Sequence, residues 1–340
     1  RSVNDQEHPK LSVIIPARNE EHNLPRLLDS LARQDVLPHE IIVIDDDSTD
    51  HTADVALVKG AKIVRPGQLP EGWGGKTWSC AQGAAAAEGE TLLFIDADTF
   101  FEDGGLRAIL DTYIDGGGAM SVGAYHRIER PYEELSAFFN ILMTAGTGAF
   151  TFRGNSRPST GLFGQFLLVD RTSYEAVGGH AAVRNRILEN FHLARRFRES
   201  GILTRCYGGR GCFSMRMYPE GLGSLIAGWS KAFASGAAET PVWIVLASIM
   251  WFVGAILAAG SLSASVIEEH PTCLGTGLYL LFVAQLWTML RRLGSFRFMT
   301  SLLYPIPLLF YQAVFARSAI VMALGSRVLW KGREVTEDDK

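Results

Sequence analysis

Two aspartates separated by one residue follow an apolar run that is typical of a buried strand. Asp96 and Asp98 come directly after residues 92–95, so in extended backbone both carboxylates point to one side and Ala97 to the other. Carboxylates are hard oxygen ligands that suit Mg²⁺ or Mn²⁺, and two of them leave positions for water and phosphate oxygens. The pair predicts a metal site for a nucleotide diphosphate, although a lone Asp-x-Asp is also common on protein surfaces.

A second acidic cluster, Asp45 to Asp47, also follows an apolar run. Ser48 and Asp50 are explained equally well as caps of the next helix. Three consecutive carboxylates repel one another, however, and indicate a ligand or a donor that uses them. An aspartate at such a strand end can accept the imide N–H of uracil.

A lysine stands in a glycine-rich stretch, GWGGKTW, at residues 72–78. Lys76 would bring a cation to the phosphates of a nucleotide, or it is a solvated loop lysine. Trp73 and Trp78 would stack on a sugar or pack against the protein, and packing is the preferred interpretation for Trp78.

These residues fall within a regular alternation of strand-like and helix-like segments. Short apolar runs at 11–17, 41–48, 62–66 and 91–99 are separated by segments with helical patterning. The alternation predicts the α/β class with a mostly parallel sheet covered on both faces. Ligands of such sheets bind at the carboxyl ends of the strands, where both acidic clusters lie.

The ordered series VIIPARNE, IIVIDDDSTDHT, GGKTW, LLFIDADT, VGGH and LEN-F-H-LARR resembles the family 2 glycosyltransferases. The resemblance covers about residues 10–235 and extends to the membrane-integral subgroup of that family. It implies a GT-A fold, a Rossmann-like domain that binds a UDP-sugar. The roles it implies are a nucleotide pocket at Pro16, Ala17, Arg18 and Glu20, uracil recognition by Asp46, the metal at Asp98, the ribose or the metal's water shell at Asp96, and the donor near Lys76.

One position departs from the family pattern. Inverting members carry a Glu-Asp pair whose aspartate removes the acceptor's proton, whereas this chain has Glu189 and Asn190, and an amide is not a base. Asn190 is an introduced change, or Glu189 has taken over, or the acceptor needs no base. The third explanation is the most economical, because a carboxylate or a lipid phosphate is already anionic at pH 7. Asn190 would then donate to the acceptor, and His192 would orient it or is simply a residue on the helix surface.

The composition changes near residue 240. No charged residue occurs from 240 to 267, and two further apolar runs follow. Three membrane segments are expected, because each run approaches the roughly 20 residues that a helix needs to cross a bilayer; buried helices of a soluble protein are the alternative. The expected organisation is a GT-A domain at 1–218, an amphipathic interfacial helix at 219–239, a transmembrane region at 240–326 with segments 240–264, 272–290 and 298–324, and a cytoplasmic tail at 327–340.

Charged residues predict the topology. The link after the first run holds Glu268 and Glu269, and the next link, residues 291–297, holds three arginines. Basic links stay in the cytoplasm, so a multi-pass protein of the cell membrane with a cytoplasmic catalytic domain is expected. The basic tail also belongs inside, and we therefore expect 298–324 to be re-entrant or bent near Pro305 and Pro307.

Together these features predict a metal-dependent inverting enzyme that moves a hexose, glucose from UDP-glucose, onto a lipid carboxylate in the bilayer. Arg216 or Lys231 would assist the leaving diphosphate. Trp229 would lie at the membrane surface unless its helix is a core helix. Segment 134–152 would form the acceptor groove or a core helix. The alternatives are transfer to polyprenyl phosphate, transfer to a neutral lipid hydroxyl with Glu189 as base, and a silent nucleotide-sugar-binding subunit.

The overall composition excludes other classes. The chain has 340 residues, of which 47% are hydrophobic and 20% charged, and this excludes intrinsic disorder. Its net charge of −4, with no separate basic face, argues against nucleic-acid binding. The four cysteines lack metal-site spacing and are expected to be reduced thiols.

Overall fold

The computed structural model describes residues 8–148, 158–186, 188–236, 242–267, 273–323, 328–330 and 333–335, and their side chains up to residue 230, from 242 to 263 and from 274 to 320. The chain forms two compact units. The sheet unit comprises Arg1–Ala124, Ala149–Met215 and Trp330–Lys340, and the helical unit comprises Tyr125–Gly148 and Arg216–Leu329. Residues 125–148 thus belong to the helical unit, although they fall inside the range 1–218 that the sequence assigned to the catalytic domain.

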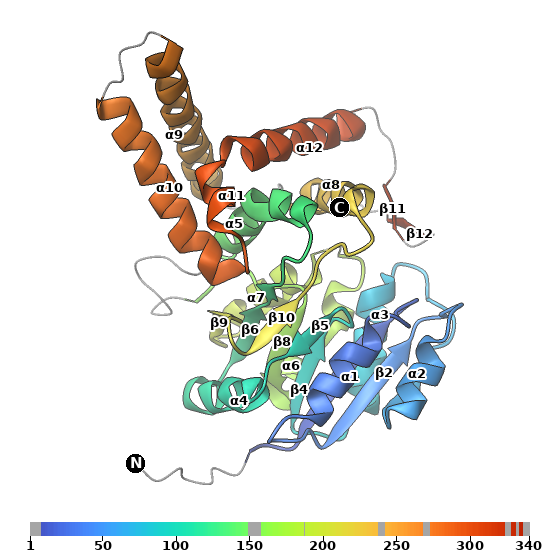
Figure 1. The fold of residues 1–340 in the computed structure, drawn as a ribbon. Coiled ribbons are helices and arrows are strands. Elements are labelled where there is room, and N and C mark those ends of the chain that lie inside the picture. The colour runs from blue at the N-terminus through green and yellow to red at the C-terminus, as the bar shows by residue number, and fades with distance from the viewer. Residues whose placement is uncertain are drawn as a thin grey trace. The chain divides into compact units, whose positions relative to one another are not determined.

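The sheet unit is built on seven strands in the order β3-β2-β1-β4-β8-β6-β9 (Figure 1). Strands β3, β2, β1 and β4 are parallel, and β8 runs antiparallel to both of its neighbours. The predicted α/β class with a mostly parallel sheet is therefore confirmed. The strands are β1 (Leu11–Ala17), β2 (Glu40–Asp45), β3 (Lys62–Val64), β4 (Thr91–Ile95), β6 (Ala119–Gly123), β8 (Phe166–Asp170) and β9 (Thr204–Gly208), with β5 (Thr99–Phe101) paired to β10 (Phe213–Met215) beside them.

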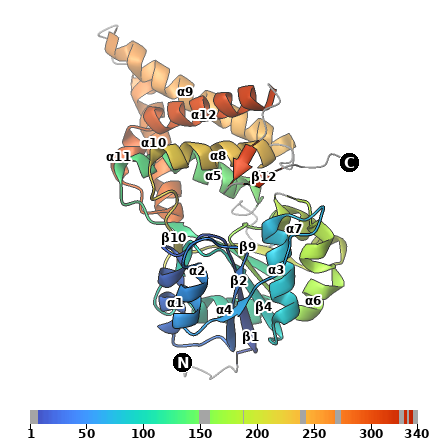
Figure 2. The same cartoon turned by 90° about the vertical axis from the view of Figure 1, so that its right-hand side faces the viewer.

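Helices cover both faces of this sheet, as Figure 2 shows with α1 and α2 on one side and α3, α6 and α7 on the other. Alternate residues of each strand face opposite layers. Ile14, Ile44 and Phe94 therefore pack in one core with residues of α3 and α7. The helices are α1 (Leu24–Ala32), α2 (Thr52–Val58), α3 (Gly75–Ala86), α4 (Gly105–Gly116), α6 (Arg171–Ala176), η3 (Gly179–Val183) and α7 (Glu189–Glu199).

The helical unit packs around aromatic residues. The Phe139 ring stacks on Trp229 with centroids 4.7 Å apart, and it meets Tyr311 edge-on at 4.9 Å. Such contacts hold three helices together. The elements are β7 (Tyr125–His126), η1 (Pro131–Ser136), α5 (Ala137–Gly146), α8 (Leu222–Gly236), α9 (Val242–Ile267), α10 (Cys273–Leu293), α11 (Phe298–Leu302) and α12 (Pro305–Ala323), and β11 (Val328–Trp330) and β12 (Arg333–Val335) lie near the C-terminus.

One helix among the described residues is long and apolar enough to cross a membrane, at Val242–Ser263 within α9. Only 17% of its most apolar stretch is buried, unlike a core helix of a soluble protein. Helix α10 has 21 residues and ends in Arg291 and Arg292. The segment from residue 298 breaks between α11 and α12, immediately before Pro305, because proline favours the first helical turn and disfavours a helical residue before it.

Candidate active site

Three of the residues singled out in the sequence meet at one ammonium group. The Lys76 Nζ lies 2.7 Å from Asp96 Oδ1 and 3.1 Å from Glu189 Oε1. It also donates a hydrogen bond to the Gly164 carbonyl at 2.8 Å. The Glu189 side chain is only 7% exposed, so its charge is compensated chiefly by this lysine. Burial lowers the pKa of Lys76, but Asp96 and Glu189 outweigh burial and raise it, so the lysine stays charged.

Lys76 lies in the first turn of α3, and the expectation that it belongs to a flexible loop is wrong. The Gly74 N–H and the Thr77 hydroxyl both donate to the Arg184 carbonyl, at 2.7 and 2.6 Å, and fix the start of the helix. Trp78 packs edge-on against Trp73 with centroids 4.9 Å apart, and its indole N–H donates to a backbone carbonyl. The packing interpretation of Trp78 is therefore confirmed.

The two aspartates that were predicted to hold a metal come directly after β4, as expected. Asp96 and Asp98 are both half-buried. Burial, with the negative charges of Asp96 and Glu20, raises the pKa of Asp98 to about 7. Among the residues that the structure describes, no third His, Cys, Asp or Glu completes a cluster that could hold a metal ion by itself. Two acidic ligands, of which Asp96 is paired with Lys76, fit a divalent cation whose other ligands come from a bound diphosphate and water.

The residues predicted to line the nucleotide pocket lie at the carboxyl ends of β1 and β2. Ala17 is the partner of Asp45 in the strand register, so the residues that follow them, Arg18 and Asp46, are neighbours. Arg18 Nη1 donates to the Asp46 carbonyl at 2.7 Å. The Asp46 side chain is 12% exposed, Ala17 is buried, and Pro16 is half-buried. The register thus explains why the two motifs meet.

Two residues in the left-handed backbone region shape the loops after these strands. Asn19 has φ of 55° and Asp47 has φ of 58°, a conformation that few residues other than glycine adopt. The loops interlock, because Asn19 N–H donates to Ser48 Oγ at 3.1 Å and Asn19 Oδ1 accepts from Thr49 N–H at 2.8 Å. Ser48 therefore ties the two loops together, which corrects its interpretation as a helix cap.

One aspartate of the acidic cluster, Asp45, and the nearby Asp50 accept hydrogen bonds from backbone amides. Asp50 accepts from the Thr52 N–H at 3.0 Å at the start of α2, in line with the capping interpretation. Asp45 accepts from Ser48 N–H at 3.1 Å. The electrostatic cost of three adjacent carboxylates is thus partly met by the loop itself. Asp46, whose carboxylate lies 4.0 Å from Arg18, is still only predicted to recognise the base.

The side-chain amide of Asn190 is already hydrogen-bonded within the protein in this structure. Its Nδ2 donates to the Phe163 carbonyl at 2.7 Å, and the residue is 4% exposed. Ser121, which the sequence reasoning missed, braces the same loop: its hydroxyl donates to the Phe166 carbonyl at 2.6 Å and accepts from Phe163 N–H at 2.9 Å. A buried serine inside a strand carries no signal of such a role in the sequence.

Successive backbone carbonyls of the loop at residues 163–166 are bound by site elements. Gly164 accepts from Lys76, and Gln165 accepts from the Asp96 N–H at 3.2 Å. Asn190 and Ser121 hold the carbonyls on either side. This carbonyl loop, as we call residues 163–166, therefore fixes Lys76 and Asp96 relative to Glu189.

The residues expected at the acceptor belong to both units, and each is described within its own unit. His192 is half-buried on α7. Arg216 is held by Glu129 at 2.7 Å and Glu133 at 2.8 Å, so its assignment to the diphosphate is not supported. Trp229 is 3% exposed and packs in the core of the helical unit, so the expectation that it lies at the membrane surface is wrong. The side chain of Lys231 lies outside the described residues.

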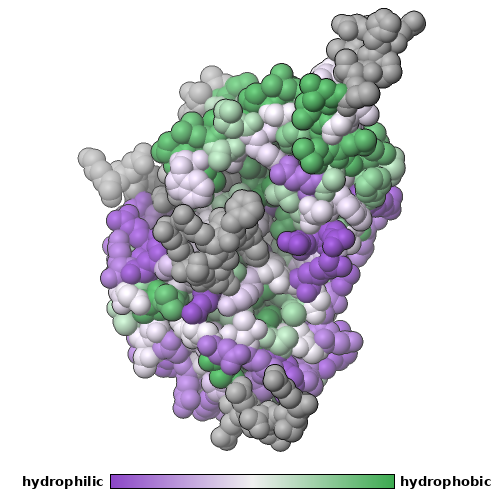
Figure 3. Space-filling view, turned by 90° about the vertical axis from the view of Figure 1, so that its left-hand side faces the viewer, coloured by the Kyte–Doolittle hydropathy of each residue, from purple (hydrophilic) through white to green (hydrophobic). Residues whose placement is uncertain are grey.

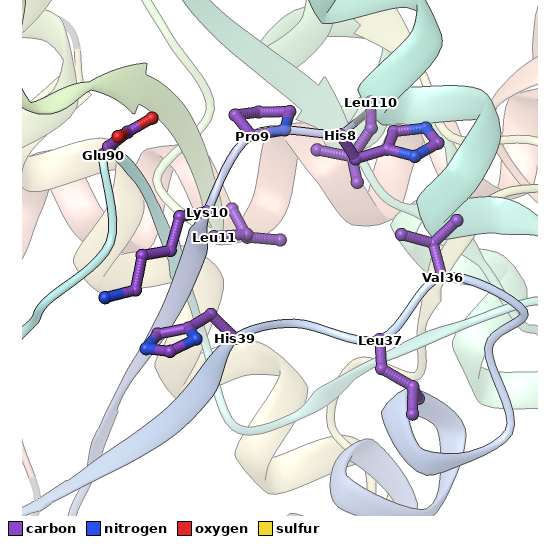
Figure 4. Close-up of a pocket in the computed structure, with 9 residues that line it drawn as sticks. All are labelled: His8, Pro9, Lys10, Leu11, Val36, Leu37, His39, Glu90 and Leu110. Carbon is purple, nitrogen blue, oxygen red and sulfur yellow. The ribbon is translucent and has the colours of Figure 1, made fainter. Parts of the chain in front are cut away.

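A cavity of about 520 Å³ lies at the amino end of β1, opposite to the end at which Ala17 lies (Figure 4). It is lined by residues around His8, Lys10, His39 and Glu90. Because ligands of parallel sheets bind at the carboxyl ends of strands, this cavity at the amino end is not the candidate active site.

Comparison with known sequences identifies the family. The sequence model described as Glycosyl transferase family 2 matches residues 12–190, from β1 to the Glu189-Asn190 pair. Two relatives named 4,4'-diaponeurosporenoate glycosyltransferase align over nearly the whole chain. The protein of Staphylococcus haemolyticus (strain JCSC1435) is 34% identical over 330 residues, which are 95% of this chain and 88% of the relative, and that of Staphylococcus aureus (strain USA300) is 33% identical over 332 residues, or 96% and 88%.

The chain therefore belongs to glycosyl transferase family 2. A solved structure agrees: the mannosyltransferase PcManGT from Pyrobaculum calidifontis, in complex with GDP-Man and Mn²⁺, superposes with a TM-score of 0.55 at 18% identity over 94% of this chain and 88% of that one. This likeness confirms the GT-A fold. The resemblance to the family 2 glycosyltransferases, predicted from the motifs, is confirmed as well.

Proposed function

We propose that this protein is a membrane-associated inverting glycosyltransferase that moves glucose from UDP-glucose onto the carboxylate of a carotenoid or comparable terpenoid. The observation that carries the proposal is the grouping of Asp96, Lys76 and Glu189 at the carboxyl edge of a family 2 domain. The names of the relatives support a carotenoid carboxylate as acceptor. The glucose and the uridine come from the family resemblance.

The proposed reaction is one displacement. An acceptor carboxylate oxygen forms a bond to the anomeric carbon, the bond from that carbon to the phosphate oxygen breaks, and the electron pair leaves with UDP. Attack opposite the leaving group inverts the configuration. No proton has to be removed, because a carboxylic acid of ordinary pKa is ionised at pH 7. This accounts for an amide at position 190.

Lys76 would have two duties in this reaction. Before the donor binds, its ammonium offsets the charges of Asp96 and Glu189. With the donor bound, the same ammonium would lie near the leaving diphosphate, where a fixed cation stabilises the negative charge that develops. Asp46 and Arg18 would bind the uridine at the neighbouring strand ends.

Asp98 and Asp96 would hold a divalent cation, Mg²⁺ or Mn²⁺, which when bound supplies Lewis-acid stabilisation of the diphosphate. Support comes from the two carboxylates themselves. Asp98 has acidic neighbours, and it forms no direct ion pair among the described contacts. Asp98 would approach the ion directly, and Asp96, already paired with Lys76, would contact the ribose or water on the ion.

The acceptor would be taken from the bilayer. A carotenoid stays in the hydrocarbon, and the apolar stretch of α9 supports membrane attachment of the enzyme. The basic residues at the end of α10 favour a cytoplasmic location for that end, and so for the sheet unit, in a chain that crosses more than once. UDP-sugars are then available on the side where the site lies.

The direct test is to incubate the detergent-purified full chain with Mn²⁺ or Mg²⁺, a panel of UDP-sugars and a total lipid extract, and to identify glycosylated lipid by mass spectrometry. A glycosyl ester that alkali cleaves supports the proposal. An alkali-stable product, or an α-anomer from an α-linked donor, contradicts it. Absence of product with every donor would favour the silent nucleotide-sugar-binding subunit.

One second candidate has a specific observation in its favour. Glu189 is almost fully buried and faces the same lysine as Asp96, so its carboxylate lies within the reaction site and not on the surface. It could remove a proton from a lipid hydroxyl. Transfer to polyprenyl phosphate, in contrast, would need no base, and alkali stability of the product separates it from the carotenoid ester.

A further inference from the structure

Helix α12 is apolar on both of its sides. One side packs into the helical unit through Leu308, Tyr311 and Val314. The other side exposes Ile306 at 57%, Leu309 at 65% and Ile320 at 59%. Exposed apolar residues of this size, repeated along one face of a helix, indicate a partner surface that is itself apolar.

The direction of α12 differs from that of the membrane-length helix. Figures 1 and 2 both show α12 lying alongside α8, and in Figure 1 it runs across the antiparallel pair of α9 and α10. Arg317 is the only charged residue of α12, and it is tied to α8 by a hydrogen bond to Ser230 Oγ at 3.2 Å. If α9 crosses a bilayer, a helix that runs across α9 and α10 in this way is placed to lie along the plane of that bilayer.

The corner between α10 and α11 marks the level of this plane. Arg291, Arg292 and Arg297 are exposed there, and they are followed at once by the exposed apolar residues Phe298 and Met299. Basic side chains beside exposed apolar ones are typical of the headgroup region. On the face in Figure 3, hydrophobic residues gather over the helical unit.

We propose that α11 and α12 form a lipid-contact surface that lies in the membrane plane at the basic end of α10 and does not cross the bilayer. The surface consists of Phe298, Met299, Leu303, Ile306, Leu309, Ala313, Ala316 and Ile320. An in-plane helix of this kind inserts its apolar side at the boundary of headgroups and acyl chains. The proposal does not depend on the reaction assigned above.

The proposed arrangement also explains how the basic link after α10 and the basic C-terminal tail can both lie in the cytoplasm. With α9 and α10 as the two crossings, the chain returns to its starting side at Arg297 and remains there. The basic tail that contains Arg327, Lys331 and Arg333 is then on the cytoplasmic side, as positive charges require. A third crossing would carry them out.

The test measures depth along α12 in the full chain, reconstituted in vesicles of phosphatidylcholine and phosphatidylglycerol. A nitroxide is attached to one cysteine at a time in a background with serine at Cys212 and Cys273. The labelled variants are Ile306→Cys, Leu309→Cys, Ala313→Cys and Ile320→Cys, with Ile249→Cys in α9 as the reference within the bilayer and Val58→Cys in α2 as the aqueous reference. Collision rates with oxygen and with a neutral nickel chelate report depth.

The proposal predicts equal, shallow depths at 306 and 320, with preferential access of oxygen. If α12 crossed the bilayer, these two labels would differ in depth by about 21 Å, at 1.5 Å per residue. Labels shielded from both reagents, with spin–spin broadening, would show that a second copy covers the surface. Either result overturns the proposal, as does preferential access of nickel at all four positions. Ala313 and Ala316 allow the test to continue if a variant at 306 or 309 does not fold.

Discussion

The side-chain amide of Asn190 donates to the carbonyl oxygen of Phe163 at 2.7 Å inside the sheet unit. The contact joins the start of α7 to the carbonyl loop, which also receives Lys76 and the Asp96 amide. It requires a donor at position 190, and a carboxylate has none. The asparagine thus fits its surroundings, and it also fits the chemistry proposed for an anionic acceptor.

Replacement of Asn190 by aspartate should therefore not improve the enzyme, although it restores the family pair. A carboxylate facing a carbonyl in a buried site must repel it or take up a proton. We expect a loss of at least about tenfold in kcat and a lower thermal unfolding midpoint. Asn190→Ala, which removes the donor but adds no charge, should be less harmful. An aspartate variant that is faster, with rates that rise with pH through a new ionisation, would contradict this prediction.

Replacement of Lys76 by methionine should lower kcat by about 100-fold, as expected for the loss of one fixed group that stabilises developing charge. The acceptor's KM should change less. Lys62→Met is the matched control, because Lys62 is an exposed lysine on strand β3. Equal kinetics of the two variants would exclude Lys76 from the reaction.

Glu189→Gln separates the two acceptor classes. With a carboxylate acceptor, no base is needed, and the loss of activity should stay below about tenfold. With a hydroxyl acceptor, the loss should reach about 10²–10⁴-fold. Rates with both acceptors are compared on the same preparation, after circular dichroism has shown that the variant is folded.

Removal of the metal should abolish transfer and weaken UDP binding. Calorimetry should show that Mn²⁺ strengthens UDP binding to the unmodified chain and not to Asp98→Asn. Asp103→Asn is the control, since Asp103 is an exposed carboxylate near the same strands. UDP affinity and turnover that are unchanged by chelation would remove Asp98 from this role.

The stability of the helical unit should fall in acid because of Glu133. The Glu133 carboxyl accepts hydrogen bonds from Arg216 and from the Glu129 and Arg130 amides. Burial by itself would raise the pKa of Glu133. The hydrogen bonds outweigh burial, and they lower this pKa below 4.5. A depressed pKa contributes stability above the unfolded value, and this stability is lost as pH falls through the folded one. The unfolding midpoint of the unmodified chain should exceed that of Glu133→Gln at pH 7, and the difference should shrink below pH 4.5. The exposed Glu220→Gln should show no such change.

Several features of this protein were determined by its sequence alone. Apolar runs with helical segments between them set the parallel part of the sheet, because alternation leaves few ways to bury each face. Asp46, Asp96 and Asp98 could be assigned to the site because each follows a strand, and strand ends share one edge. The ordered motifs also gave the family, since a series of six is far more specific than one.

Other features were decided only by the tertiary structure. Lys76 meets Glu189, and Asn190 meets Phe163, across large sequence separations, and backbone carbonyl acceptors leave no trace in residue types. Arg216 and Trp229 looked available for a ligand, yet their partners come from η1 and α5. The same hydrophobic run can cross a membrane or lie along it, because hydropathy gives the affinity of a helix for lipid and not its direction. In α12, we propose that packing against α8 sets that direction.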